Sequence, residues 1–192
     1  MSKMSEREKM KIAITGTIGS GKTEVSNHLR KLGYDVFDCD EVNRKLLNER
    51  GYELLHDSFP ECFEGELLNK KTLADIVFSD TEKKAKLESI MHPIILEELS
   101  NRKDDPLFAE VPLLFETGWD KYFDENILII CKEETAIERL KLRGFTELEA
   151  KNRINNQMPV REKIKKATRI IYNNGSLDEL YELIDNCLKD IC

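Results

Sequence analysis

The chain lacks any long hydrophobic run. Its apolar stretches, such as Ile127–Cys131, are far shorter than the roughly 20 residues that a membrane-spanning helix needs. The first ten residues, MSKMSEREKM, alternate in charge and contain no apolar core, which is not the pattern of a secretory signal. We therefore expect no membrane partner, and we expect residues 1–10 to form a tail ahead of the folded domain.

The chain also lacks paired cysteines and an excess of positive charge. Its five cysteines are scattered and show no CxxC spacing, which argues against a disulfide framework and a zinc site and favours a reducing, cytoplasmic location. Lys and Arg number 30 against 37 Asp and Glu, a net charge of −7. A nucleic-acid partner, which requires a basic surface, is therefore not expected.

One segment departs from this acidic average. Residues 132–169 hold eleven Lys or Arg against six Asp or Glu, which favours a local site for anions. A solvated helix face with a basic bias is the alternative, and charge alone does not decide between the two.

The 192 residues, 40% of them hydrophobic, are enough for one globular α/β domain with a five-stranded, mainly parallel sheet. The predicted strands are 11–15, 34–38, 107–114, 127–131 and 170–172, and the predicted helices 21–31, 134–143 and 176–188. We expect one domain over residues 11–192, with its core in 11–41, 106–143 and 160–192. Residues from about 42 to 105 read as a helical insertion, and 144–159 as a polar lid.

A complete GxxxxGK[ST] motif follows the first strand and opens the first helix, which is the context that the motif requires. Its glycines allow backbone N–H groups to converge on phosphate oxygens, and the helix N-terminus adds positive potential. The lysine reaches the β- and γ-phosphates of a nucleoside triphosphate, and the threonine hydroxyl ligates Mg²⁺. The motif therefore predicts a nucleoside triphosphate site formed by Gly16, Thr17, Ile18, Gly19, Ser20, Gly21, Lys22 and Thr23.

Carboxylates follow the second strand as Asp38-Cys39-Asp40, at the sheet edge that faces the ligand crevice in parallel sheets. In a small kinase such a carboxylate deprotonates the acceptor hydroxyl, and we favour this role for Asp40. A helix N-cap is the alternative. Arg139 and Arg143 share one helix face and could clamp the transferring phosphoryl group, although either could be an ordinary surface arginine.

Together these residues resemble the dephospho-coenzyme A kinase family over about residues 11–190. The matching motifs are T-G-x-I-G-S-G-K-T at 15–23, D-x-D with a downstream arginine (Asp38, Asp40, Arg44), H-P at His92-Pro93, V-P-L-L-x-E at 111–116, R-I-x-x-Q at Arg153–Gln157 and I-I-x-N at 170–173. Two positions depart from the family pattern. Thr17 replaces a glycine, and Thr168 replaces an aspartate, so we assign no role to that position.

The resemblance implies a three-layer, nucleotide-kinase-like P-loop fold and the transfer of the ATP γ-phosphoryl to the ribose 3′-hydroxyl of dephospho-CoA, the last step of CoA biosynthesis. It makes Asp40 the base and Lys22 and Arg139 the groups that meet the developing charge, with Arg143 as a lid contact to the nucleotide. It places the acceptor on Asp38, Arg44, His92 and Glu116.

Other interpretations remain open at this point. His92 before Pro93 is also typical of a structural residue at a helix kink, and Glu116 could simply be exposed beyond its strand. The rival functions are a kinase for another small metabolite and a regulatory NTPase, although the N-K-x-D pattern of guanine recognition is absent from the sequence. We expect a monomer or a small homo-oligomer.

Overall fold

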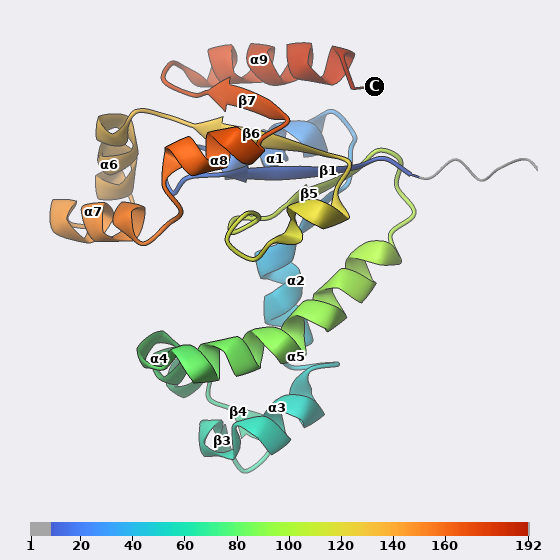
Figure 1. The fold of residues 1–192 in the computed structure, drawn as a ribbon, viewed down its shortest axis with the longest axis vertical. Coiled ribbons are helices and arrows are strands. Elements are labelled where there is room, and N and C mark those ends of the chain that lie inside the picture. The colour runs from blue at the N-terminus through green and yellow to red at the C-terminus, as the bar shows by residue number, and fades with distance from the viewer. Residues whose placement is uncertain (1–8, 192) are drawn as a thin grey trace, which may run out of the picture. The chain divides into compact units, whose positions relative to one another are not determined.

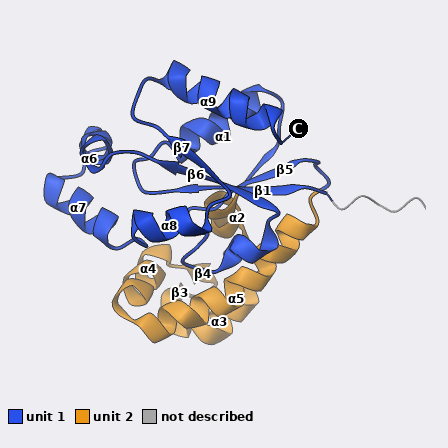
Figure 2. Ribbon diagram, turned by 45° about the horizontal axis from the view of Figure 1, so that its top comes forward, with its two compact units in different colours: residues 1–37, 103–192 blue, residues 38–102 orange. Residues whose placement is uncertain are grey.

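The computed structural model describes residues 9–191, so most of the predicted tail lies outside the described residues. The chain divides into two compact units, coloured separately in Figure 2. The first unit holds the chain up to Phe37 and again from Lys103 onward, and the second holds Asp38–Arg102. Among the described residues, no helix is both long enough and apolar enough to cross a membrane.

The first unit is built on a five-stranded sheet in the order β2-β5-β1-β6-β7. Its strands are β1 (Lys11–Gly16), β2 (Val36–Asp38), β5 (Leu107–Glu110), β6 (Glu125–Ile130) and β7 (Arg169–Tyr172). β1 pairs in parallel with β5 and β6, and β6 pairs in parallel with β7. The predicted parallel sheet is confirmed, and β1, which leads into the phosphate-loop motif, is its central strand.

Helices cover both faces of this sheet. The helices of this unit are α1 (Lys22–Lys31), α6 (Glu133–Leu142), α7 (Glu147–Asn155), α8 (Val160–Lys166) and α9 (Leu177–Lys189), and a short 3₁₀ turn, η2, spans Trp119–Tyr122. α1 and α9 lie on one face and α8 on the other (Figure 1). Ile14 and Ile129 of the sheet pack with Leu29 of α1 and Ile184 of α9 in one buried cluster. Each such side chain contributes about 1.5–3 kcal/mol when buried, so this cluster holds the phosphate loop on a rigid base.

The second unit is mostly helical. Its elements are α2 (Cys39–Leu46), α3 (Tyr52–Ser58), η1 (Pro60–Cys62), β3 (Phe63–Glu64), β4 (Leu67–Leu68), α4 (Lys70–Ser79) and α5 (Thr81–Ser100). The insertion that was expected to be helical also contains the antiparallel β3–β4 hairpin, which turns at Gly65 with φ 64°. Two-residue strands are too short to show an alternating pattern in the sequence.

Several predicted element ends were wrong. The strand expected over 107–114 ends at Glu110, because Val111 donates the last bond to Ile14 and Pro112 has no N–H to continue the ladder. The strand expected from residue 34 begins at Val36. The next helix begins at Cys39 rather than near residue 42. The segment 144–159 contains the helix α7, and its role as a lid stays a prediction.

Thr168 has a structural role in this sheet. Its hydroxyl accepts from the Asn126 N–H and donates to the Asn126 carbonyl, both at 2.7 Å, and its own N–H donates to the Asn126 side chain at 3.1 Å. These bonds extend the β6–β7 pairing by one residue. A hydroxyl can both donate and accept, which an ionised aspartate at this position could not do.

Candidate active site

The phosphate loop joins the end of β1 to the start of α1 over residues 16–22. Gly19 and Gly21 have φ values of 76° and 98°, and Gly21 is the N-cap of α1. Positive φ is the region that favours glycine. No non-glycine residue in the described part of the chain requires it, so Thr17 fits where the family pattern has a glycine.

Close packing behind the loop also requires glycine. A Cβ on Gly16 would overlap the Ile129 carbonyl of β6, and a Cβ on Gly21 would overlap the Asn173 side chain. The loop is therefore held against the two strands that follow β1 in the sheet. Its curled backbone is a preformed cradle rather than a flexible turn.

A brace of two side chains, Arg139 and Asn173, fixes the carbonyl groups of the loop. Asn173, directly after β7 and 4% exposed, donates to the Ser20 carbonyl at 2.8 Å. Arg139 of α6 donates to the Gly19 and Ser20 carbonyls at 3.3 and 3.4 Å and to the Asn173 side chain at 3.3 Å. In a trans peptide the carbonyl and the next N–H point in opposite directions. Holding the Ser20 carbonyl therefore turns the Gly21 N–H toward the other side of the loop.

The sequence predicted roles at the nucleotide for two arginines of α6, Arg139 and Arg143. Arg139 was expected to stabilise the transferring phosphoryl, and the described contacts of its guanidinium are with the loop and Asn173. Its catalytic role stays a prediction. Arg143 is the exposed C-cap of α6, and its contact with the nucleotide likewise stays a prediction. Asn173 entered the sequence argument only through a family motif, and its role was missed.

A thiol lies beside the same loop. Cys131, directly after β6, approaches the Gly19 carbonyl with its Sγ at 3.8 Å. Burial raises the pKa of this thiol, and the neighbouring Arg139 offsets part of that shift. The group is therefore neutral near pH 7 and acts here as a weak donor.

The two reactive side chains of the motif are in place. Lys22 donates through Nζ to the carbonyls of Gly16 and Thr17, each at 3.0 Å, so its ammonium lies across the start of the loop. Thr23 is exposed in the first turn of α1, and its Oγ1 lies 3.4 Å from Oε1 of Glu110. Glu110 is buried and also accepts from the Ser26 hydroxyl at 2.6 Å.

Glu110 was missed by the sequence reasoning. It is the last residue of β5, where carboxylates of a parallel sheet face the ligand crevice, but the strand had been predicted to run to residue 114. The Thr23 hydroxyl and this carboxylate are hard oxygen donors that fit Mg²⁺, which usually takes one or two protein ligands together with waters and substrate phosphates. Within residues 9–191 no group of three or more His, Cys, Asp or Glu side chains is arranged to hold a metal. These two residues therefore fit an ion that arrives with a nucleotide.

Glu116 has a structural partner. Its Oε1 accepts from Lys163 of α8 at 2.6 Å and from the Met158 N–H at 3.1 Å. The Lys163 side chain is fully buried, and that of Glu116 is 20% exposed. The ion pair joins the loop after β5 to α8, and the bond from Met158 joins the same loop to the segment between α7 and α8. The predicted contact of Glu116 with the acceptor stays a prediction.

The other acceptor-side residues belong to the second unit. Asp38 is the N-cap of α2 and accepts from the Glu41 N–H at 2.9 Å. The alternative that Asp40 is the cap is therefore wrong, and Asp40, like Arg44, is an exposed residue of α2. His92 lies within α5 before Pro93, and burial lowers the pKa of its imidazole. The substrate roles of these residues stay predictions.

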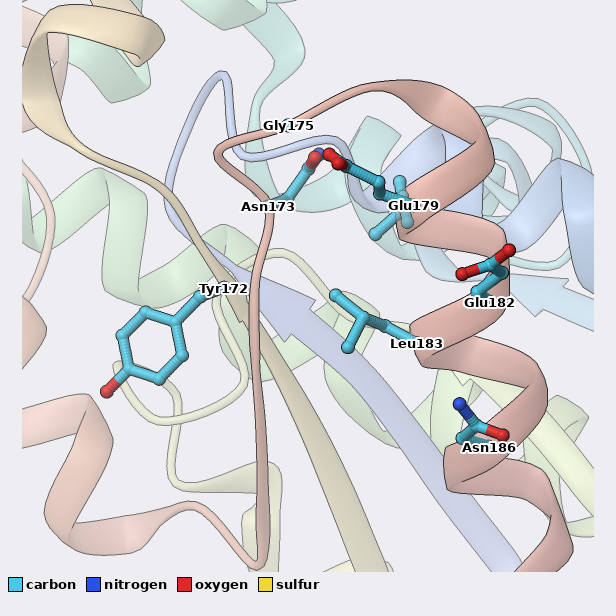
Figure 3. A pocket seen from close by; sticks show the side chains of 8 residues that line it. Tyr172, Asn173, Gly175, Glu179, Glu182, Leu183 and Asn186 are labelled. Atoms are coloured by element: carbon cyan, nitrogen blue, oxygen red, sulfur yellow. The ribbon is translucent and has the colours of Figure 1, made fainter.

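A pocket of about 320 Å³ lies between β7 and α9 (Figure 3). Figure 3 shows Glu182, Leu183 and Asn186 on the side of α9 that faces β7, and Asn173 of the brace also lines this pocket. The carboxylates of Glu179 and Glu182 line it as well. Negative charge of this kind repels a polyphosphate, so this pocket does not suit nucleotide phosphates.

The parallel sheet with the loop between its central strand and α1 is the architecture of a P-loop kinase. The family model for dephospho-CoA kinase matches residues 10–179. The chain belongs to the dephospho-CoA kinase family, as the sequence motifs indicated.

Individual relatives agree with this assignment. A dephospho-CoA kinase of Thermus thermophilus is 38% identical over 185 residues, which is 94% of this chain and 91% of the relative. A solved structure from Thermus thermophilus is 38% identical, with a TM-score of 0.84 over 97% of this chain and all of the other. The solved dephospho-CoA kinase of Campylobacter jejuni is 27% identical, with a TM-score of 0.70 over 94% of this chain and 96% of the other.

Proposed function

We propose that this protein is a dephospho-CoA kinase, which transfers the γ-phosphoryl group of ATP to the ribose 3′-hydroxyl of dephospho-CoA and releases CoA and ADP. The observation that supports this most strongly is the complete phosphate loop over residues 16–23, in a chain whose residues 10–179 match this family. A regulatory NTPase and a kinase for another metabolite share the loop but not the family match.

In the reaction, a bond forms between the 3′-oxygen of the acceptor and the γ-phosphorus, and the bond to the β,γ-bridging oxygen breaks. The hydroxyl proton passes to the carboxylate of Asp40, and ADP leaves. Catalysis in such transfers depends on positioning and on stabilisation of charge. A preformed loop supplies both, because its N–H groups need no reorganisation when charge develops on the phosphates.

Named residues supply each part of this chemistry. Lys22 exchanges its two loop carbonyls for phosphate oxygens when ATP binds, because an anion is a better partner for an ammonium than a neutral carbonyl. Arg139 is placed beside the loop to meet charge on the phosphoryl group. Thr23 and Glu110 would hold Mg²⁺, which would supply positive charge to offset the charge that develops on the phosphates.

A coupled ADP-release assay tests this function. The full chain is incubated with ATP and Mg²⁺, with dephospho-CoA or with a panel of nucleosides, nucleotides and sugars, and the product is identified by mass spectrometry. We expect ADP release to depend on dephospho-CoA and CoA to accumulate in equal amount. Faster transfer to another acceptor would assign a different kinase, and hydrolysis independent of any acceptor would assign an NTPase.

A further inference from the structure

A glutamine from the lid segment occupies a backbone donor of the phosphate loop. The Ile18 N–H donates to Oε1 of Gln157 at 2.8 Å. Ile18 lies inside the loop, and Gln157 follows the C-terminal end of α7, 139 residues away in the sequence. A carboxamide oxygen is a neutral acceptor of the kind that a phosphate oxygen replaces, since hydrogen bonds to an anionic acceptor are stronger.

The segment that carries Gln157 is anchored on both sides of that residue. The Gln157 N–H donates to the Ile154 carbonyl at 3.2 Å, which continues the last turn of α7. The next residue, Met158, donates to Glu116 at 3.1 Å, and Glu116 is held by the buried Lys163. The Gln157 backbone is thus fixed near the loop, and the side chain is the part that can leave the Ile18 N–H.

Lys22, like the Ile18 N–H, has its hydrogen-bond partners within the protein. Its ammonium donates to the Gly16 and Thr17 carbonyls, so internal partners satisfy both the loop lysine and the Ile18 N–H. Backbone N–H groups buried without a partner are rare because they are costly. A side chain that satisfies Ile18 stabilises the curled loop while no triphosphate is bound, and it competes for this donor when one arrives.

We propose that Gln157 is an internal competitor of the triphosphate: its carboxamide oxygen stands in for a β- or γ-phosphate oxygen at the Ile18 N–H and is displaced when ATP binds. The inference rests on the proposed function, because it takes ATP as the ligand of the loop. In this role Gln157 sets the selectivity of the loop among nucleotides. ATP gains an N–H in exchange for displacing the amide, whereas AMP, which lacks both outer phosphates, leaves the amide in place.

Isothermal titration of the full chain with ATP·Mg²⁺ and with AMP tests this proposal. Gln157→Met keeps the length of the side chain and removes the acceptor, and Asn156→Met is the matched control at the exposed residue before it. We expect Gln157→Met to lower the Kd for ATP roughly fivefold, the factor that corresponds to one ordinary hydrogen bond. The Kd for AMP should stay within about twofold of the wild-type value, and the control should change neither constant.

A third variant sharpens the test. Gln157→Glu keeps an acceptor at the Ile18 N–H and adds a negative charge beside the phosphates, so the Kd for ATP should rise roughly tenfold or more. Unchanged or weaker ATP binding by Gln157→Met would overturn the proposal, because it would show that Gln157 does not compete or that it holds the nucleotide. Equal losses for ATP and AMP would mean a merely structural role and would also overturn it.

The outcome is separable from that of the proposed function. Wild-type protein that binds ATP and phosphorylates dephospho-CoA retains its assigned activity whatever the Gln157 variants do. Wild-type protein that binds no ATP would remove the proposed function and this inference together.

Discussion

The buried ion pair between Glu116 and Lys163 provides a quantitative test of the structure. Among residues 9–191, the Lys163 ammonium has a single acceptor, Oε1 of Glu116 at 2.6 Å, and the lysine side chain has no exposed surface. Glu116→Ala would therefore leave a buried charge without a partner, which typically destabilises a protein by about 3–5 kcal/mol. For a chain of this size the melting temperature should fall by about 6–20 °C.

The reverse substitution should be milder. Lys163→Met fills the same space without charge and leaves Glu116, whose side chain is 20% exposed, with its bond from the Met158 N–H. We expect a loss of only about 1–2 kcal/mol. The double variant Glu116→Ala/Lys163→Met should then be more stable than Glu116→Ala alone by about 2 kcal/mol, because it no longer buries an unpaired ammonium.

Urea unfolding followed by tryptophan fluorescence measures these differences in the first unit. Trp119 is the one tryptophan of the chain, is buried, and lies three residues after Glu116. Glu116→Gln serves as the matched variant, since it keeps an acceptor and removes only the charge. A loss below about 1 kcal/mol for Glu116→Ala, or a double variant no more stable than that single one, would refute the reasoning.

Further substitutions test the site itself. Lys22→Ala should lower kcat at least about 10²–10³-fold with an unchanged circular dichroism spectrum, and normal turnover would contradict the assignment of the loop. Asp40→Asn should lower kcat with little change in ATP affinity, because it removes the base and not a nucleotide contact; a variant that fails mainly by unfolding would indicate a structural role. Asn173→Ala removes the buried donor to the Ser20 carbonyl and should lower kcat/KM for ATP roughly tenfold, with KM for dephospho-CoA little changed; equal effects on both substrates would argue against a specific brace. Burial lowers the pKa of His92 in the folded protein, so as the pH falls the imidazole is protonated in the unfolded chain before it is protonated in the folded one. The stability that the neutral imidazole contributes is therefore complete above about pH 6.5 and is lost as the pH falls through the folded pKa. The melting temperature of the wild type relative to His92→Gln should therefore fall between pH 7.5 and 5.5, and an unchanged difference would refute this.

Sequence predictions were accurate where the interacting residues are close along the chain and failed where they are far apart. The helix predicted over 176–188 was readable because its signals are local: at the start of α9, Ser176 and Glu179, three residues apart, make the two hydrogen bonds of a capping box. The strand predicted to run to residue 114 was wrong because an apolar run does not show where a ladder stops. The ladder stops after Val111 donates to the Ile14 carbonyl, because Pro112 has no N–H to continue it.

The sequence did not reveal the side chains that support the loop, because they too contact residues far away along the chain. Asn173 donates to a carbonyl 153 residues earlier in the chain, and Glu110 lies beside a threonine 87 residues before it. Neither residue type is unusual, and neither spacing forms a motif. Their proximity follows from the strand order β2-β5-β1-β6-β7, which places the ends of β5 and β7 at the same edge of the sheet as the loop.

The sequence by itself determined the phosphate loop, its lysine and the family, because a helix N-terminus and glycines at fixed spacing act over a few residues. Only the tertiary structure decided which groups brace that loop, which carboxylate stands beside Thr23, and which side chain occupies the Ile18 N–H. Those contacts join segments about 90 to 150 residues apart, and parallel pairing of strands, not local residue preference, brings such segments together.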